Sequence, residues 1–192
     1  MSYTNWAVKP YDVGLICGRF QTFHKGHEKL IETGLLLCDR LLILVGSAQE
    51  CGTERNPLNI NTRIKMLRMV YGDSPNIMIY ALSDLNDTTD NGATWGKYLL
   101  DNVKRYVYKN PEVMIYGNDD CRSTWFDKND LKYTTELILN RSELPICATE
   151  VRRLMVLDKR QEWMEKVNPK LHKMYDELRS ELMTVPFYRD MK

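Results

Sequence analysis

The sequence has few features of a secreted or membrane protein. It has no C-x-x-C spacing, and its five cysteines, an odd number, fit a reducing compartment better than a disulfide framework. The longest apolar run, Leu41 to Val45, is far too short to cross a bilayer. Met1 to Pro10 lacks the apolar stretch of a signal peptide. We therefore expect a cytoplasmic protein with no membrane partner.

The sequence also lacks an excess of charge of either sign. The chain has 27 basic and 26 acidic residues and a net charge of +1, which argues against a general binder of nucleic acid or of a membrane surface. Neither familiar phosphate-binding fingerprint, G-x-x-x-x-G-K-[ST] or G-x-G-x-x-G, is present. A hydride-transferring Rossmann enzyme is thus the least favoured alternative, and any anion site must be local.

What is present is an alternation of strand-like and helix-like segments. A chain of 192 residues suits a single domain, which buries roughly 70% of its unfolded surface. The predicted strands are Val13–Cys17, Leu41–Val45, Ile77–Leu82, Val113–Tyr116 and an edge-like segment over Leu131–Leu139. The predicted helices run from Lys25 through Cys38, from Ile60 to about Gly72, and from Trp95 to Tyr106.

This alternation predicts an α/β fold, a Rossmann-like doubly wound parallel sheet of about five strands. We expect one domain over 1–192, with a core at about 11–158 and a helical C-terminal extension at about 159–192. Residues 148–182 read as continuous helix, broken once at Asn168-Pro169. The apolar stripes of this region fit packing against the domain or against another subunit, so a homo-oligomer stays open.

The turn between the first strand and the first helix carries unusual chemistry. His24 and His27 are three residues apart at the helix entrance and would share a face, beside Arg19. The positive end of a helix and its free N–H groups suit an anion, so the turn indicates a phosphate site. The alternatives are a solvated helix cap and a zinc site, although no third ligand follows at the usual spacing.

A second helix start lies in the segment 145–153. Thr149 is a plausible N-cap, and Arg152 follows three residues later, so a hydroxyl and a guanidinium would meet whatever binds there. The alternative is an ordinary capped helix with a solvated arginine pair. Ligands of parallel sheets bind outside the carboxyl ends of the strands. Two cationic helix starts at one such edge are what a triphosphate requires.

Three motifs resemble a known family. Residues 18–27, Gly-Arg-Phe-Gln-Thr-Phe-His-Lys-Gly-His, resemble the motif of the H-x-G-H nucleotidyltransferases, and most closely that of the archaeal and bacterial nicotinamide mononucleotide (NMN) adenylyltransferases, typically G-R-F-Q-P-F-H-x-G-H. Residues 46–50 with 55–57, and 148–153, are similar to the next two motifs of that family. The sequence departs from the pattern at Thr22, where proline is usual, and at Cys147, where serine is usual and a thiol is the weaker donor.

The resemblance implies transfer of AMP from ATP to NMN by direct in-line attack, giving NAD and pyrophosphate, with Mg²⁺ held mainly by the phosphates rather than by protein ligands. It implies catalytic roles for His24, His27 and Arg152. It implies ATP or phosphate binding by Arg19, Arg55, Gly117, Asn118, Cys147 and Thr149. It implies NMN binding by Gly18, Phe20 and Gln21 through their main-chain groups, and by Asp84 and Trp95, of which Trp95 has a plain helix-core role as its alternative.

Two other functions stay open. A related adenylyl- or cytidylyltransferase would use another phosphorylated acceptor, which the Gly-Arg-Phe-Gln start at residue 18 disfavours. A non-catalytic module that senses NAD would not need His24, His27 and Arg152 together. The expected partners are small molecules only, with no nucleic acid.

Overall fold

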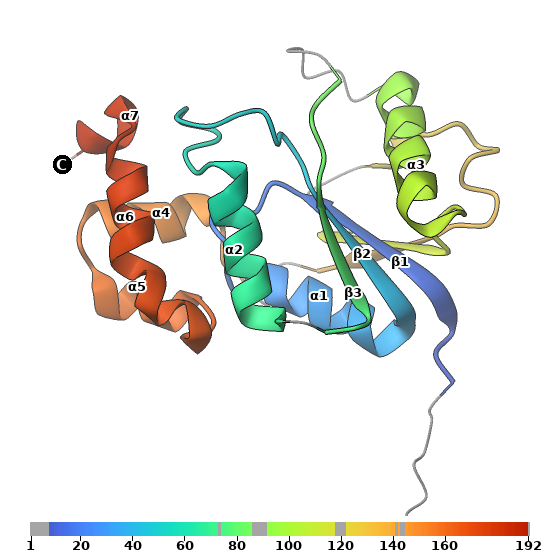
Figure 1. The fold of residues 1–192 in the computed structure, drawn as a ribbon, viewed down its shortest axis with the longest axis horizontal. Helices are drawn as coiled ribbons and strands as arrows, with labels where there is room; N and C mark the ends of the chain where they lie inside the picture. The colour runs from blue at the N-terminus through green and yellow to red at the C-terminus, as the bar shows by residue number, and fades with distance from the viewer. Residues whose placement is uncertain are drawn as a thin grey trace, which may run out of the picture.

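A five-stranded parallel sheet in the order β3-β2-β1-β4-β5 forms the centre of the molecule (Figure 1). The computed structural model describes residues 8–72, 74–85, 92–117, 122–140, 142 and 145–191. The strands are β1 (Tyr11–Gly18), β2 (Cys38–Val45), β3 (Ile77–Ala81), β4 (Val113–Gly117) and β5 (Thr135–Leu139). The strand order and the parallel pairing confirm the predicted doubly wound α/β fold.

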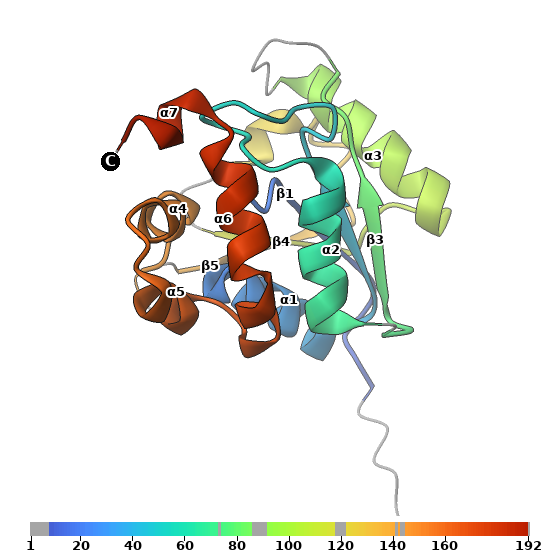
Figure 2. The same cartoon turned by 60° about the vertical axis from the view of Figure 1, so that its left-hand side comes forward.

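Helices cover both faces of this sheet (Figure 2). One face packs against α1 (Lys25–Leu37), α2 (Ile60–Tyr71) and the C-terminal helices, and the other against α3 (Ala93–Val107) and the short η1 (Ser123–Trp125). Along β2, Ile43 joins the first core cluster, while Leu42 and Leu44 join the second. Because both faces are buried, the strand reads as a continuous apolar run rather than an alternating one.

The C-terminal region contains α4 (Ala148–Val156), α5 (Arg160–Lys166), η3 (Pro169–Met174), α6 (Tyr175–Met183) and α7 (Pro186–Arg189). The prediction of a single break in the helix over 148–182 is therefore wrong, since the chain also breaks at 157–159. Asp158 has a φ of 52° there, which is incompatible with a right-handed helix. The expected break at Asn168 is confirmed, and its side chain caps η3 by accepting from the N–H of Lys170. Trp163 and Leu178 are fully buried in the core cluster that also contains Ile31 of α1.

Two predicted element ends differ from the structure. Cys38 starts β2 instead of ending the preceding helix, and it is fully buried where a Cβ on Gly14 would lie 2.4 Å from its Sγ. Residues 131–134 form a turn rather than a strand, because the N–H of Thr134 bonds to the carbonyl of Leu131 at 3.1 Å. The preceding Asp127 accepts from the N–H of Asn129 at 2.8 Å, a local bond typical of turns. The fifth strand therefore starts only at Thr135.

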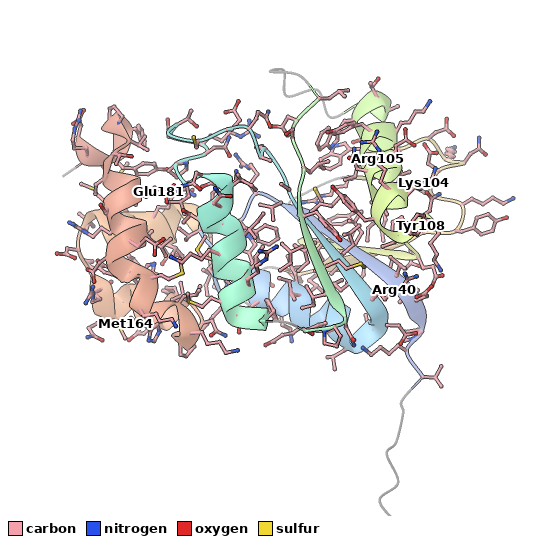
Figure 3. The ribbon with its side chains drawn as sticks, in the orientation of Figure 1. Arg40, Lys104, Arg105, Tyr108, Met164 and Glu181 are labelled. Atoms are coloured by element: carbon pink, nitrogen blue, oxygen red, sulfur yellow. The ribbon has the colours of Figure 1, made fainter. Side chains whose placement is uncertain are left out.

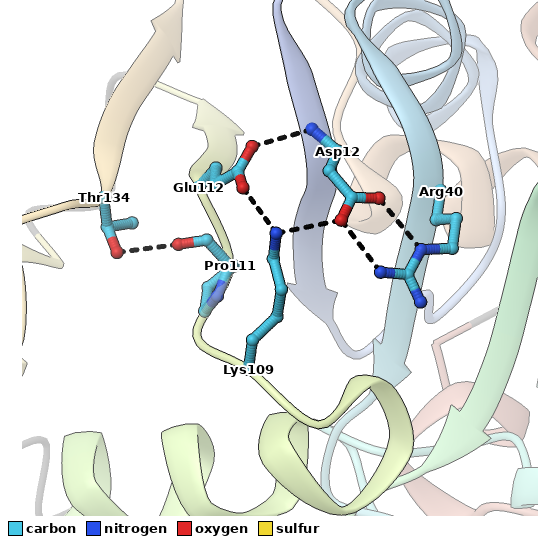
Figure 4. A network of polar contacts seen from close by, with 6 residues as sticks. All are labelled: Asp12, Arg40, Lys109, Pro111, Glu112 and Thr134. Atoms are coloured by element: carbon cyan, nitrogen blue, oxygen red, sulfur yellow. Dashed lines mark hydrogen bonds and ion pairs between the residues drawn. The ribbon is translucent and has the colours of Figure 1, made fainter.

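An ion-pair network ties the amino ends of the central strands together (Figure 4). Asp12 of β1 lies 3.0 Å from Arg40 of β2 and 2.9 Å from Lys109, and its N–H donates to Glu112 at 2.7 Å. Hydrogen bonds from Arg40 and Lys109 lower the pKa of Asp12 to about 2. This network lies at the opposite end of the sheet from the carboxyl ends where ligands bind. None of the described helices is long and apolar enough to span a membrane.

Candidate active site

The histidine pair lies where α1 begins. His24 is the N-cap of α1, and its Nδ1 accepts from the N–H of Gly26 at 3.1 Å. That nitrogen therefore presents a lone pair, so the neutral ring carries its proton on Nε2. The rings of His24 and His27 stack with centroids 3.9 Å apart and planes 22° apart. The structure thus brings together the two imidazoles that the spacing placed on one face.

Buried aromatic rings and a glutamine fix the turn that leads into this helix. Phe20 and Phe23 are almost fully buried, and their ring centroids lie 4.9 and 5.9 Å from that of His27. The Gln21 amide makes reciprocal bonds of 2.9 Å with the main chain of Leu58. The side chains of Phe20 and Gln21 therefore hold the turn in place, which agrees with the expectation that these residues meet NMN through main-chain groups.

The second helix start differs in its cap from the prediction. The N-cap of α4 is Cys147, whose Sγ accepts from the N–H of Glu150 at 3.4 Å. Thr149, expected as the cap, lies two residues after it in the first turn, and its Oγ1 is 3.2 Å from Nη2 of Arg152. Cys147 is exposed. Its thiol caps the helix at the position where serine would place a hydroxyl.

Arg152 joins the two helix starts. The residue is 8% exposed, its Nε donates to the Tyr188 hydroxyl at 2.7 Å, and its Nη1 donates to the main-chain carbonyl of Gln21. Gln21 belongs to the turn that carries His24, so the segments around residues 24 and 149 are adjacent in space. Each terminal nitrogen of a guanidinium carries a second hydrogen. Arg152 therefore retains the capacity to bind an anion while it is held in place.

A cavity lies at the start of α1 and reaches Ile146, the residue before the Cys147 cap, while Cys147, Thr149 and Arg152 do not line it. It is lined by His24, Gly26, His27, Lys29, Leu30, Gly117, Leu139, Asn140 and Ile146. Gly117 ends β4 and Leu139 ends β5, so the cavity is at the carboxyl ends of the strands, beside the point where the strand order reverses. A Cβ on Gly26 would lie 2.9 Å from the His24 ring and 3.6 Å from the carbonyl of Ile146, which explains the glycine.

Lys29 lines this cavity but was not predicted as a site residue from the sequence. It lies on the first turns of α1 and adds an ammonium group to the two imidazoles. Its position two residues after His27 could have indicated a role in the site, but this indication is weak because exposed lysines on helices are common. Of the predicted ATP-binding residues, Gly117 lines the cavity, and Asn118 lies outside the described residues.

A fully buried arginine, also missed, organises the loop after β2. Arg63 of α2 donates to the carbonyls of Gly46 at 2.7 Å, Ser47 at 3.0 Å and Arg19 at 3.1 Å. Burial lowers its pKa to about 10. Arg63 lies on the apolar stripe of α2, three residues before the buried Met66, and this position could have predicted its burial. Arg63 therefore holds the loops after β1 and β2 against each other.

Arg19 and Arg55, predicted to bind phosphate, lie on these two loops. Nη1 of Arg19 is 3.5 Å from the main-chain carbonyl of Arg55. The Arg55 side chain is exposed, and neither arginine lines the cavity at the histidine pair. The structure brings the two arginines to the rim formed by the loops rather than to the cavity itself.

Two side chains predicted to bind NMN lie after β3 and at the start of α3. They are Asp84 and Trp95. Asp84 donates its N–H to the Gln49 amide oxygen at 2.9 Å, and the Gln49 nitrogen lies 3.4 Å from its carboxylate. Trp95 is half-buried on α3, and its ring centroid is 6.4 Å from that of Trp125 at 78°. Neither Asp84 nor Trp95 lines the cavity at the histidine pair.

Arg122 and Trp125 were missed by the sequence prediction. The Arg122 guanidinium lies 5.2 Å from the ring centroids of Tyr116 and Trp125, and its Nη1 donates to the carbonyl of Cys17 at 2.7 Å. A Cβ on Gly96 of α3 would lie 1.8 Å from the Trp125 carbonyl, so this glycine lets η1 approach the helix. An aromatic and cationic wall therefore borders the end of β1 on the α3 side.

The donors at the site do not form a protein metal centre. Among the described residues, no group of three or more His, Cys, Asp or Glu side chains could hold a metal ion. The polar side chains lining the cavity are imidazole, ammonium and amide groups. This set suits an anion, and Mg²⁺ would fit here when phosphate oxygens supply most of its ligands.

Known proteins are similar to this chain in sequence and in fold. The profile of the cytidylyltransferase-like family matches residues 15–168. A nicotinamide-nucleotide adenylyltransferase of Pyrococcus horikoshii is 32% identical over 143 residues, which cover 74% of this chain and 72% of the relative. The enzyme of the same name from Saccharolobus solfataricus is 28% identical over 172 residues, covering 88% of this chain and 92% of the relative.

A solved structure agrees in fold. The bifunctional NMN adenylyltransferase/ADP ribose pyrophosphatase of Francisella tularensis, complexed with AMP and a manganese ion, matches with a TM-score of 0.67 and 22% identity. The match covers 94% of this chain but only 52% of that protein, so this chain spans about half its length. The resemblance to NMN adenylyltransferases seen in the three sequence motifs is confirmed. By its match over most of its length, this chain is a member of the cytidylyltransferase-like family.

Proposed function

We propose that this protein is an NMN adenylyltransferase, which transfers AMP from ATP to NMN and releases NAD and pyrophosphate. The observation that carries the proposal is the contact of Arg152 with the main chain of Gln21, which places two cationic helix starts at one sheet edge. The names of the relatives, similar over most of this chain, support the choice of reaction.

The chemistry is a direct displacement. A 5′-phosphate oxygen of NMN forms a bond to the α-phosphorus of ATP, and the bond from that phosphorus to the oxygen bridging to the β-phosphorus breaks. The electron pair leaves with pyrophosphate, so no protein nucleophile is required. Catalysis of such a step consists of positioning and of stabilising negative charge.

The cationic groups divide this task. We assign His24, through its Nε2–H, and His27 to the transferring phosphate and to the charge that develops on pyrophosphate. Arg152, with Thr149 and Cys147 at the start of α4, binds the β- and γ-phosphates. Lys29 adds positive charge in the cavity lined by His24 and His27. Mg²⁺, held mainly by the phosphates rather than by protein ligands, would neutralise part of their charge.

The remaining assignments concern the two nucleosides and the rim. Arg19 and Arg55 contact phosphate from the loops after β1 and β2, and Gly117 with Asn118 meets the adenosine. Main-chain groups of Gly18, Phe20 and Gln21 line the NMN side. Trp95 stacks on the nicotinamide ring, and Asp84 meets its amide or ribose. The expected partners are ATP, NMN and NAD.

An acceptor panel tests this function. The purified protein is mixed with MgATP and with NMN, nicotinic acid mononucleotide, phosphopantetheine or a polyol phosphate, and pyrophosphate release and dinucleotide formation are measured. We expect turnover with a nicotinamide-type mononucleotide. Turnover only with another acceptor would identify a different nucleotidyltransferase, and NAD binding without any pyrophosphate release would identify a sensor module.

A further inference from the structure

One tyrosine near the C-terminus reaches the arginine assigned to ATP. Tyr188 of α7 is 3% exposed, although it lies on a four-residue helix at the end of the described chain. Its hydroxyl accepts from Nε of Arg152 at 2.7 Å and donates to the main-chain carbonyl of Glu54 at 2.6 Å. Burial raises the pKa of this hydroxyl, so it stays protonated and makes both bonds at neutral pH. A single group thereby joins α7, α4 and the loop before α2.

The same C-terminal region also holds the other end of that loop. Glu181 of α6 accepts from the N–H of Asn59 at 2.7 Å and from the Thr62 hydroxyl at 2.6 Å, at the start of α2. Figure 3 shows Glu181 between the two helices, and Figures 1 and 2 both show the loop reaching from α2 to α7. The loop carries Arg55, one residue after the carbonyl that Tyr188 binds. Its position therefore depends on α6 and α7.

The Arg152 guanidinium is held at all three of its nitrogens. Tyr188 fixes Nε, the Gln21 carbonyl fixes Nη1, and Thr149 contacts Nη2. The bond at Nε adds a third fixed point to the planar fork, beside those at its two terminal nitrogens. A fork fixed before the ligand arrives loses less entropy when it binds phosphate.

We propose that Tyr188 is a positioning residue for ATP, whose hydroxyl orients Arg152 and couples it to the loop that carries Arg55. This inference rests on the proposed function, because it assumes that Arg152 binds the ATP phosphates. It gives the C-terminal helix α7 a role in the reaction although α7 contributes no group that touches the reacting atoms. Tyr188 contacts Arg152 on α4 and Glu54 on the loop before α2, so we expect its effect on ATP rather than on the acceptor.

The test compares two conservative substitutions in the full chain. Tyr188→Phe keeps the ring and removes both bonds, and Tyr175→Phe is the matched control, because Tyr175 is equally buried and bonds through its hydroxyl to Asp158 at 2.9 Å. We expect Tyr188→Phe to weaken ATP binding and kcat/KM for ATP by roughly tenfold, while KM for NMN changes less than about twofold. Tyr175→Phe should leave all three unchanged. Tyr188→Leu repeats the measurement with a different side-chain packing.

A double substitution separates positioning from general loosening. Lysine has no guanidinium Nε–H, so Arg152→Lys already lacks this contact with Tyr188. Adding Tyr188→Phe then removes only the bond to the Glu54 carbonyl and should weaken ATP binding by less than it does in the wild type. Unchanged ATP binding in Tyr188→Phe, an equal loss in Tyr175→Phe, or additive losses in the double variant would each overturn the inference.

Calorimetric titration with ATP alone keeps this test independent of the acceptor. If the wild type binds ATP but does not use NMN, the proposed function fails, and the ATP affinities still decide the role of Tyr188. If the wild type does not bind ATP, both proposals are overturned.

Discussion

Arg152 on α4 donates a hydrogen bond to the main-chain carbonyl of Gln21, 131 residues earlier in the chain. Gln21 stands three residues before His24, so the arginine from one helix start is bonded to the turn that forms the other. A wide separation of these segments would have excluded a single triphosphate between them. Their contact instead makes the two helix starts parts of one site.

His27 is expected to be required for turnover. A preorganised donor that stabilises developing charge is typically worth about 10²- to 10³-fold in rate, so His27→Ala should lose at least that factor in kcat. Pyrophosphate release measures the loss, and the thermal midpoint checks the fold. His172→Ala is the control, because His172 bonds to the carbonyl of Met164 at 3.1 Å in the C-terminal region. Near-normal turnover of His27→Ala would remove His27 from the mechanism.

Cys147 is expected to accept replacement by serine. The hydroxyl is a stronger donor and cap than the thiol, so Cys147→Ser should lower KM for ATP a few-fold and keep or raise the thermal midpoint. Cys147→Ala removes the bond to the Glu150 N–H and should cost about 1 kcal/mol of stability. Cys51→Ser, at another exposed cysteine, should change neither quantity. A higher KM in Cys147→Ser would contradict a phosphate contact at this position.

Arg63 is expected to support both stability and ATP use. Lysine cannot reproduce the fork that bonds to Gly46, Ser47 and Arg19, so Arg63→Lys should lose about 3 kcal/mol in the free energy of unfolding. The loops after β1 and β2 would loosen, and kcat/KM for ATP should fall. Urea unfolding and steady-state kinetics measure the two effects. Arg68→Lys, on the exposed side of the same helix, should change neither the stability nor kcat/KM. Unchanged values in Arg63→Lys would show that the two loops keep their positions without the Arg63 bonds.

Asp12 is expected to contribute pH-dependent stability. Its pKa is lowered from 3.8 to about 2 in the folded protein. A lowered carboxyl pKa stabilises the fold above pH 3.8, and that contribution is lost as the pH falls through about 2. The side chain is 43% exposed, so solvent screening keeps the effect below about 1 kcal/mol.

Urea midpoints of wild type and Asp12→Asn should therefore differ at pH 7 and converge toward pH 2. Asp101→Asn is the control, because its contact with Lys104 is 4.0 Å long and exposed. A difference that stays constant over this pH range would show that the ion pairs with Arg40 and Lys109 do not produce the stabilisation.

Local patterns were sufficient for most of the architecture. The apolar runs at Leu41–Val45 and Val113–Tyr116 are the strands β2 and β4, and the end of α2 at Gly72 was expected. The pairing of His24 with His27 also followed from their spacing, because residues three apart on a helix share a face wherever the helix lies. The fifth strand was predicted too long, since turn hydrogen bonds at 127–134 compete with extended structure.

The sequence alone determined the alternation of strands and helices, the two cationic helix starts and the motifs that resemble the adenylyltransferases. Only the tertiary structure decided that Arg63 is a buried hub, that Lys29 lines the cavity and that Tyr188 reaches Arg152. The physical reason is that Arg63 and Tyr188 bond to main-chain carbonyls or to groups far along the chain, and that Lys29 shares its cavity with residues at the ends of β4 and β5. Every residue has such a carbonyl, so the residue pattern does not mark the partner, and packing alone brings the two together.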